Sequence, residues 1–70
     1  MKMEKKIFVG GINCLHCTEY VSDALENIGA KNVEVSFIKS LATLEIADGI
    51  TDESIRICIE DAGYEVVRIE

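Results

Sequence analysis

Hydrophobic and polar residues alternate with two different periods along this 70-residue chain. In the first, apolar side chains recur at every second position or β-branched residues dominate, which is typical of strands with one buried face. This rhythm predicts four β-strands, at residues 5–9, 32–37, 42–46 and 65–69. In the second, apolar residues recur every three or four positions, which is typical of a helix with one face on a core. This rhythm predicts two helices, at residues 17–28 and 52–62.

The ends of the predicted helices carry their own signals. Thr51 is a good N-cap for the second helix, because its hydroxyl can accept a hydrogen bond from a backbone N–H of the first turn. Gly29 and Gly63 follow the two helices as C-caps, where glycine adopts the left-handed conformation at little cost. The elements therefore come in the order strand, helix, strand, strand, helix, strand.

This order predicts an α+β, ferredoxin-like βαββαβ sandwich, in which two helices cover one face of a four-stranded antiparallel sheet. Right-handed crossovers make the first strand central and set the last strand antiparallel beside it. The corner Gly63-Tyr64 should then lie next to the loop at residues 10–17. A chain this short builds one thin core, so residues 1–70 are expected to form a single domain.

The composition of the chain argues against several classes of function. Seven basic residues against thirteen acidic ones give a formal charge of −6, which argues against nucleic acid, because phosphate neutralisation needs a basic face. The apolar run Ile7-Phe8-Val9 is too short for a signal peptide or for direct membrane insertion, so we expect a cytoplasmic protein. Disulfides are rare in that compartment, and three cysteines are an odd number for a disulfide framework.

Two of these cysteines, Cys14 and Cys17, stand between the first strand and the first helix. The N-terminus of a helix favours negative charge and lowers the pKa of a nearby thiol. Two thiolates without further ligands suit a soft, low-coordinate ion such as Cu(I), whereas structural zinc requires four ligands. The spacing alone leaves two alternatives open, namely a pair of small buried residues and a thioredoxin-like redox site. The chain has no proline, and therefore no cis-proline to flank a disulfide-exchange site.

The segment Gly11-Ile12-Asn13-Cys14-Leu15-His16-Cys17 resembles the Gly-Met-x-Cys-x-x-Cys signature of heavy-metal-associated domains. The segment 59–66, Ile-Glu-Asp-Ala-Gly-Tyr-Glu-Val, is similar to the closing segment of the same family. The resemblance implies the ferredoxin-like fold, binding of a soft metal by Cys14 and Cys17, and transfer of that metal to a docked partner. Among the members, the chain looks most like a bacterial copper chaperone, although a metal-binding domain excised from a pump would look the same.

The chain departs from the family pattern at two positions. Ile12 replaces the usual methionine, which packs under the loop, and isoleucine fills a similar volume. Asn13 stands where threonine or serine is common. Family domains that transport zinc, cadmium or lead often carry Asp there, so a neutral Asn13 favours copper.

Three neighbours of the cysteine pair complete the prediction. His16 should face solvent, because adjacent helical residues point about 100° apart and Cys17 turns inward. Tyr64 is the candidate lid over the cysteines, with ordinary packing at a strand start as its alternative role. Cys58 belongs to the apolar stripe of the second helix and is expected to be a buried spacer outside the coordination shell.

The sequence thus predicts a non-enzymatic copper(I) chaperone that passes its metal to a metal-transporting P-type ATPase or a copper-responsive regulator. The expected metal ligands are Cys14 and Cys17, with Tyr64, Asn13 and His16 around them. We expect a monomer, or a dimer bridged through shared copper. The alternatives are a carrier for Hg(II) or Zn(II), an excised pump domain, and a thiol–disulfide oxidoreductase.

Overall fold

The computed structural model describes residues 3–13, 15–47 and 49–70. Within these residues the elements follow the predicted order. They are β1 (Met3–Gly10), α1 (Leu15–Asn27), β2 (Lys31–Ser36), β3 (Leu41–Ile46), α2 (Asp52–Asp61) and β4 (Glu65–Ile69).

The four strands form one antiparallel sheet in the order β2-β3-β1-β4. The central position of β1 and its pairing with β4 confirm the predicted topology. Gly10, at the end of β1, pairs with Glu65, the first residue of β4. The chain that enters β4 therefore lies beside the chain that leaves β1.

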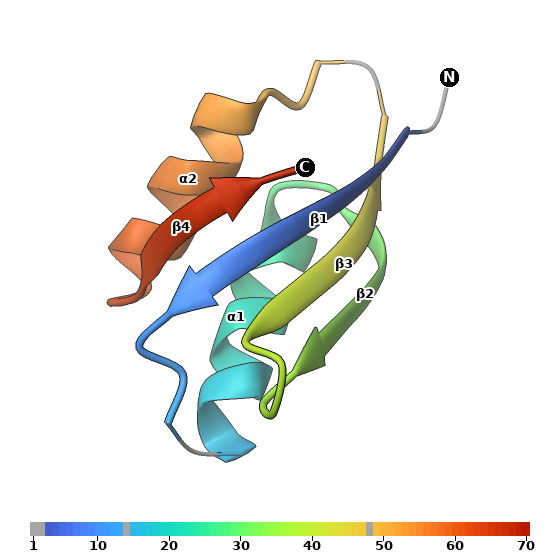
Figure 1. Ribbon diagram of the computed structural model, residues 1–70. Coiled ribbons are helices and arrows are strands. Elements are labelled where there is room, and N and C mark those ends of the chain that lie inside the picture. The colour runs from blue at the N-terminus through green and yellow to red at the C-terminus, as the bar shows by residue number, and fades with distance from the viewer. Residues whose placement is uncertain (1–2, 14, 48) are drawn as a thin grey trace.

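Both helices lie together on one face of the sheet (Figure 1). The core between the two layers consists of the inward-facing residues of β1 and β3 and the inner stripes of the helices. Its fully buried large side chains are Ile7, Val9, Val21, Leu25, Ile55 and Ile59. The predicted fold class is confirmed.

Hydrogen bonds at the helix ends match the signals in the sequence. The hydroxyl of Thr51 accepts from the backbone N–H of Ser54, and the Ser54 hydroxyl lies 3.0 Å from the backbone nitrogen of Thr51, which completes a capping box. Gly29 and Gly63 both have positive φ, at 101° and 97°. The N–H of the residue after each glycine bonds back to a carbonyl five residues earlier, which closes both helices in the same way.

Two boundaries differ from the predictions. Helix α1 begins at Leu15 rather than at the predicted Cys17. The prediction began too late because residues 15 and 16 are exposed and do not contribute to the apolar periodicity. Phe37 was expected in the second strand but lies in the turn after Ser36, where it is 36% exposed. That turn spans residues 37–40 and places Ser40 at a φ of 52°.

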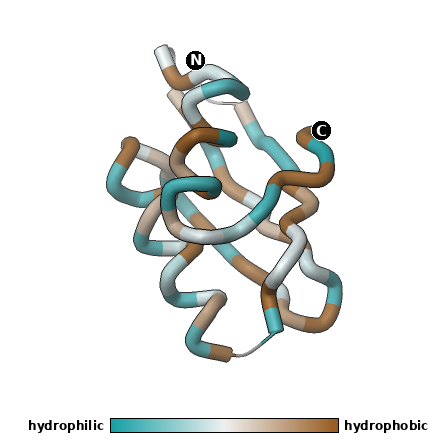
Figure 2. Tube along the Cα trace, turned by 90° about the vertical axis from the view of Figure 1, so that its left-hand side faces the viewer, coloured by the Kyte–Doolittle hydropathy of each residue, from teal (hydrophilic) through white to brown (hydrophobic). Residues whose placement is uncertain are grey.

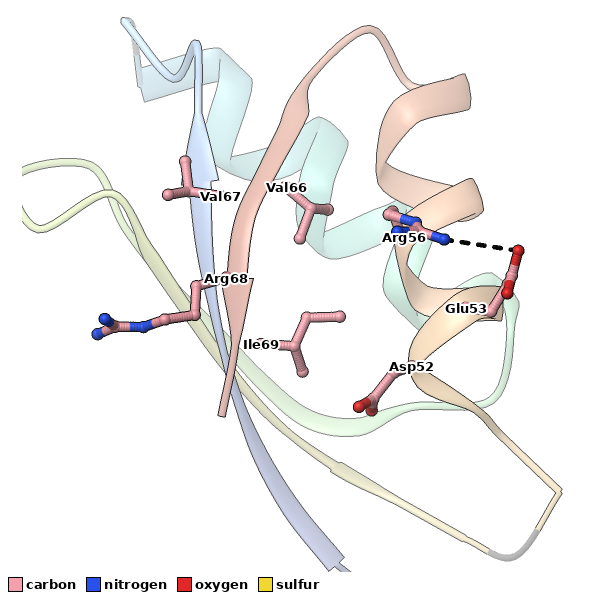
Figure 3. A pocket seen from close by; sticks show the side chains of 7 residues that line it. All are labelled: Asp52, Glu53, Arg56, Val66, Val67, Arg68 and Ile69. Atoms are coloured by element: carbon pink, nitrogen blue, oxygen red, sulfur yellow. Dashed lines mark ion pairs between the residues drawn. The ribbon is translucent and has the colours of Figure 1, made fainter.

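Both edge strands are irregular. In β2 the register with β3 shifts between Lys31 and Glu34, and in β4 Val67 is an extra residue opposite the step from Phe8 to Val9. Figure 3 shows the result in β4, where Val66 and Ile69 point toward α2 while the two residues between them point away. Such bulges protect exposed edges from pairing with other chains.

Hydrophobic and hydrophilic residues interleave along the whole trace (Figure 2). Within the ranges that the structure describes, neither helix has the length and apolar character needed to span a bilayer.

Candidate metal site

The loop between β1 and α1 carries the predicted metal-binding segment. Its first residue, Gly11, has a φ of +91°, which side-chain-bearing residues rarely adopt. The next residue, Ile12, is only 8% exposed and belongs to the hydrophobic core. Ile12 therefore anchors the loop from below, as expected for the residue that replaces methionine. Cys14 lies outside the described residues.

Cys17 sits in the first turn of α1 with its side chain turned inward. It is 6% exposed and belongs to the core cluster together with Ile12 and Val21. Its Sγ lies 3.7 Å from Oδ1 of Asn13, within reach of a thiol hydrogen bond. The expected inward orientation of Cys17 is therefore observed, and its sulfur borders the loop rather than the middle of the sheet.

The start of α1 is electrostatically suited to a thiolate. Backbone N–H groups in a first helical turn lack partners within the helix and point toward its N-terminus. The first turn of α1 contains no acidic residue. Thr18 bonds locally, with its hydroxyl donating to the Leu15 carbonyl at 2.6 Å. No carboxylate of this turn therefore offsets the attraction between the helix end and a negative sulfur.

Tyr64 lies against the loop, where the topology predicted it. It follows Gly63 directly and precedes β4, so the pairing of Gly10 with Glu65 holds it at this end of the sheet. A Cβ added to Gly11 would lie 3.8 Å from Cδ1 of Tyr64, which places the ring beside the glycine. Tyr64 is half-buried and packs against the core, so the observed contact fits both of its predicted roles.

His16 points away from the core. Its side chain is 84% exposed, and Nδ1 lies 3.9 Å from a carboxylate oxygen of Glu19 one turn later. The expected exposure is therefore observed, while the exclusion of His16 from the coordination shell stays a prediction.

Cys58 differs from its prediction as a buried spacer, because it is only half-buried. It lines a shallow groove between α1 and α2, in which the small side chains of Ala24 and Ala62 leave the thiol partly uncovered. Its Sγ donates a hydrogen bond to the Ala24 carbonyl at 2.9 Å. Burial, and secondly the nearby carboxylate of Asp61, raise the pKa of this thiol. Cys58 is thus held as a neutral thiol on the helical layer.

Sequence reasoning missed the exposed apolar residues at the end of the molecule that carries the loop. Leu15 is 74% exposed and Ile38 is 90% exposed. The turn that carries Ile38 is tied to the end of β1 by a hydrogen bond from the Val9 N–H to the Ser40 carbonyl. The adjacent apolar pair Phe37-Ile38 breaks the alternation of its strand, and this signal could have indicated an exposed position.

The described residues contain no group of three or more His, Cys, Asp or Glu side chains able to hold a metal ion. The Cys17 sulfur donates a hydrogen bond to the side-chain amide oxygen of Asn13. An amide oxygen is a weak ligand for soft metals.

Comparison with curated proteins finds two kinds of relative. A mercuric reductase from Lysinibacillus sphaericus is 40% identical over 65 residues, which cover 93% of this chain and 12% of that protein. The copper chaperone CopZ from Staphylococcus epidermidis is 34% identical over 65 residues, covering 90% of this chain and 96% of the chaperone. The chain spans about a tenth of the length of the mercuric reductases that it matches. No family model matches the chain.

Solved structures give the same fold. A heavy metal binding protein from Thermotoga maritima is 31% identical, with a TM-score of 0.82 and 97% of both chains covered. A copper binding domain of the P-type ATPase HMA7 is 30% identical, with a TM-score of 0.81, covering 97% of this chain and 99% of that one.

The conformation of Gly11 gives a stability prediction. Replacing Gly11 by Ala should lower the free energy of unfolding by about 1–2 kcal/mol, because an L-residue at this φ is strained. The contact with Tyr64 at 3.8 Å is ordinary and adds no clash. Gly10→Ala is the matched control, since its added Cβ would meet Val67 and Glu65 at 3.5–3.6 Å without a positive φ. Urea denaturation of both variants should separate them, and equal losses would contradict the strain argument.

The raised pKa of Cys58 gives a pH prediction. Below the ordinary thiol pKa of about 8.5, Cys58 is protonated in both the folded and unfolded states. As the pH rises above this value the unfolded thiol ionises first, so the contribution of Cys58 to stability falls until the pH passes its folded pKa. The stability difference between the wild type and Cys58→Ala should therefore shrink from pH 7.5 to 9.5 in reducing urea titrations. A constant difference would show that the folded and unfolded thiols titrate alike.

Proposed function

Because the chain belongs to the heavy-metal-associated domain family, we propose that it is a copper(I) carrier that binds its cargo through Cys14 and Cys17. The observation that carries this proposal is the position of Cys17, with its sulfur at the first turn of α1, beside the loop and anchored on the core. Cys14 stands three residues earlier in the sequence and one before the helix. Two such thiolates form a soft, low-coordinate donor set.

The charge of the loaded site supports copper. Two thiolates and one Cu(I) carry a net charge of −1, whereas two thiolates and one Hg(II) are neutral. A helix N-terminus without acidic residues in its first turn stabilises the negative complex, by about 0.3–1 kcal/mol at an exposed site. This electrostatic contribution shifts the preference for Cu(I) over Hg(II) by only a few fold. The thiolates therefore supply the affinity for the metal, and the helix N-terminus adjusts the choice between the two metals.

Handover proceeds by exchange of thiolates around the metal. A thiolate of the partner bonds to Cu(I) and gives a three-coordinate intermediate, after which one sulfur of the carrier leaves the metal and takes up a proton from solvent. A second thiolate of the partner then displaces the remaining carrier sulfur in the same way. No electron is transferred, and copper stays Cu(I) throughout. The burial of Cys17 favours it as the last ligand to leave, because the entering sulfur must approach from the solvent side of the loop.

The partner that we propose is a metal-transporting P-type ATPase or a copper-responsive regulator, met in the cytoplasm. A copper binding domain of such an ATPase shares this fold at 30% identity. The formal charge of −6 suits a partner with a basic docking face. We propose a monomeric, non-enzymatic carrier that copper can bridge into a dimer through shared thiolates.

Hg(II) is a second candidate cargo. The 40% identity to a mercuric reductase favours it, and mercury also accepts two thiolates. Competition between equimolar Cu(I) and Hg(II), each buffered by a chelator under reducing conditions, separates the two assignments. Selective retention of copper supports the proposal. Retention of mercury alone would show that the cargo is Hg(II) and not Cu(I). Turnover in an insulin-reduction assay would instead indicate thiol–disulfide exchange.

The cysteine pair gives the direct prediction. The reduced wild type should bind one equivalent of Cu(I), and the double variant Cys14→Ser, Cys17→Ser should bind none, because hydroxyl groups are poor ligands for soft metals. Cys58→Ser is the matched control and should bind one equivalent, since its thiol is protonated and bonded to Ala24. Affinity should also fall as the pH is lowered, because metal binding displaces thiol protons.

His16→Ala belongs to the same titration and should leave the stoichiometry at one, because the imidazole is exposed and directed toward Glu19. Binding by the double variant would contradict the whole assignment. Loss of copper binding in His16→Ala would instead show that His16 is a third ligand of the metal.

A further inference from the structure

The groove between α1 and α2 is an open hollow of about 530 Å³ on the surface of the helical layer. Both helices contribute apolar side chains to it, and Ile57, at its α2 side, is 50% exposed. Contiguous apolar surface that faces solvent marks interaction sites more often than scattered apolar residues do. The apolar residues that line the groove are Ala24, Ile28, Ile57, Cys58 and Ala62.

The shape of the groove favours a helix as its occupant. The hydrogen bond from the Cys58 Sγ to the Ala24 carbonyl, at 2.9 Å, joins the two helices across the groove. Two helices held side by side leave a groove that a third helix can fill with a ridge of side chains (Figure 1). The ten residues of α2 span about 15 Å, so an occupant of about three turns would cover it. An extended segment would instead need a free strand edge, and both edge strands are bulged.

The charge on the two helices selects the chemistry of that occupant. Helix α1 carries three acidic residues and no lysine or arginine, and α2 carries four acidic residues and one arginine, so each helix has a net charge of −3. The helices therefore account for the whole formal charge of −6, and acidic and basic residues balance in the rest of the chain. Among the residues that the structure describes, four of the helical carboxylates have no ion-pair partner, namely Asp23, Glu26, Glu60 and Asp61.

We propose that the groove between α1 and α2 is a docking site for a basic amphipathic helix of a partner protein. The apolar stripe of that helix fills the groove, and its lysine or arginine residues lie over the carboxylates of α1 and α2. A second copy of this chain does not suit the groove, because it would set one helical layer of charge −6 against another. The inference goes beyond the proposed copper carriage, since this surface uses neither Cys14 nor Cys17. The chain can therefore hold its partner whether or not metal is loaded.

The test titrates the reduced, metal-free chain with a synthetic peptide of leucine and lysine, about 14 residues or four helical turns long. Leucines at the spacing i, i+3, i+4 and i+7 give the peptide one apolar stripe. Backbone amide NMR should show the shifts concentrated at the groove, around Ala24, Ile28, Ile57 and Cys58. A scrambled peptide of the same composition keeps the charge but loses the stripe, and it should bind about tenfold more weakly.

Two substitutions separate the apolar and the charged parts of the surface. Ile57→Ser should weaken peptide binding about tenfold, because it removes an apolar side chain from the groove. Val67→Ser is its matched control and should change nothing, since Val67 is 66% exposed on β4 and points away from α2 (Figure 3). Asp61→Asn should weaken binding about two- to fivefold at low salt and less at high salt. Glu65→Gln, an exposed carboxylate of β4, is the control for charge.

The double variant Cys14→Ser, Cys17→Ser separates this inference from the proposed function. It should bind the peptide as the wild type does, and Cys58, its only thiol, should react more slowly with iodoacetamide when the peptide is bound. Equal binding of the ordered and scrambled peptides, or full binding by Ile57→Ser, would overturn the inference. A dimer of the metal-free chain that Ile57→Ser abolishes would also overturn it, because a second copy would then occupy the groove. The NMR shifts of the wild type test the site even where a variant fails to fold.

Discussion

The inward orientation of Cys17 at the first turn of α1 is the constraint on which the rest of the site depends. This residue is a member of the hydrophobic core and also one of the two proposed metal ligands. A side chain that is 6% exposed has a fixed position, so the helix cannot shift without disturbing the core. Because β1 ends at Gly10 and α1 begins at Leu15, only four residues of the sequence separate the strand from the helix.

The second half of the chain supports the same place through sheet topology. The pairing of β4 with the central strand β1 brings the corner after α2 beside the loop, and the turn at Gly63 directs Tyr64 onto Gly11. Gly11 lies beside this ring in a left-handed conformation, which glycine adopts at little cost because it has no Cβ. One end of the sandwich thus gathers a helix N-terminus, a core-anchored loop and an aromatic ring from segments about fifty residues apart in sequence.

Periodicity predicted the element order, the topology and the place of Tyr64, because each depends on which face of a strand or helix is buried. The start of α1 escaped prediction because Leu15 and His16 are exposed and leave no apolar signal. The groove that leaves Cys58 half-buried is lined by residues from both helices, so the apolar stripe of one helix could not predict it. The hydrogen bond between Asn13 and Cys17 could not be predicted either, since it depends on the backbone conformation that places Asn13 beside the helix. The two cysteines themselves were evident from their spacing.

The central claim is that sulfur alone holds the metal at the start of α1. X-ray absorption at the copper edge, recorded on the reduced monomer carrying one equivalent of Cu(I), measures the ligands directly. The account predicts a spectrum fitted by two sulfur neighbours, unchanged in His16→Ala and absent in the variant with serine at both positions 14 and 17. A nitrogen neighbour that disappears in His16→Ala, or four sulfur or nitrogen neighbours around each copper, would contradict it.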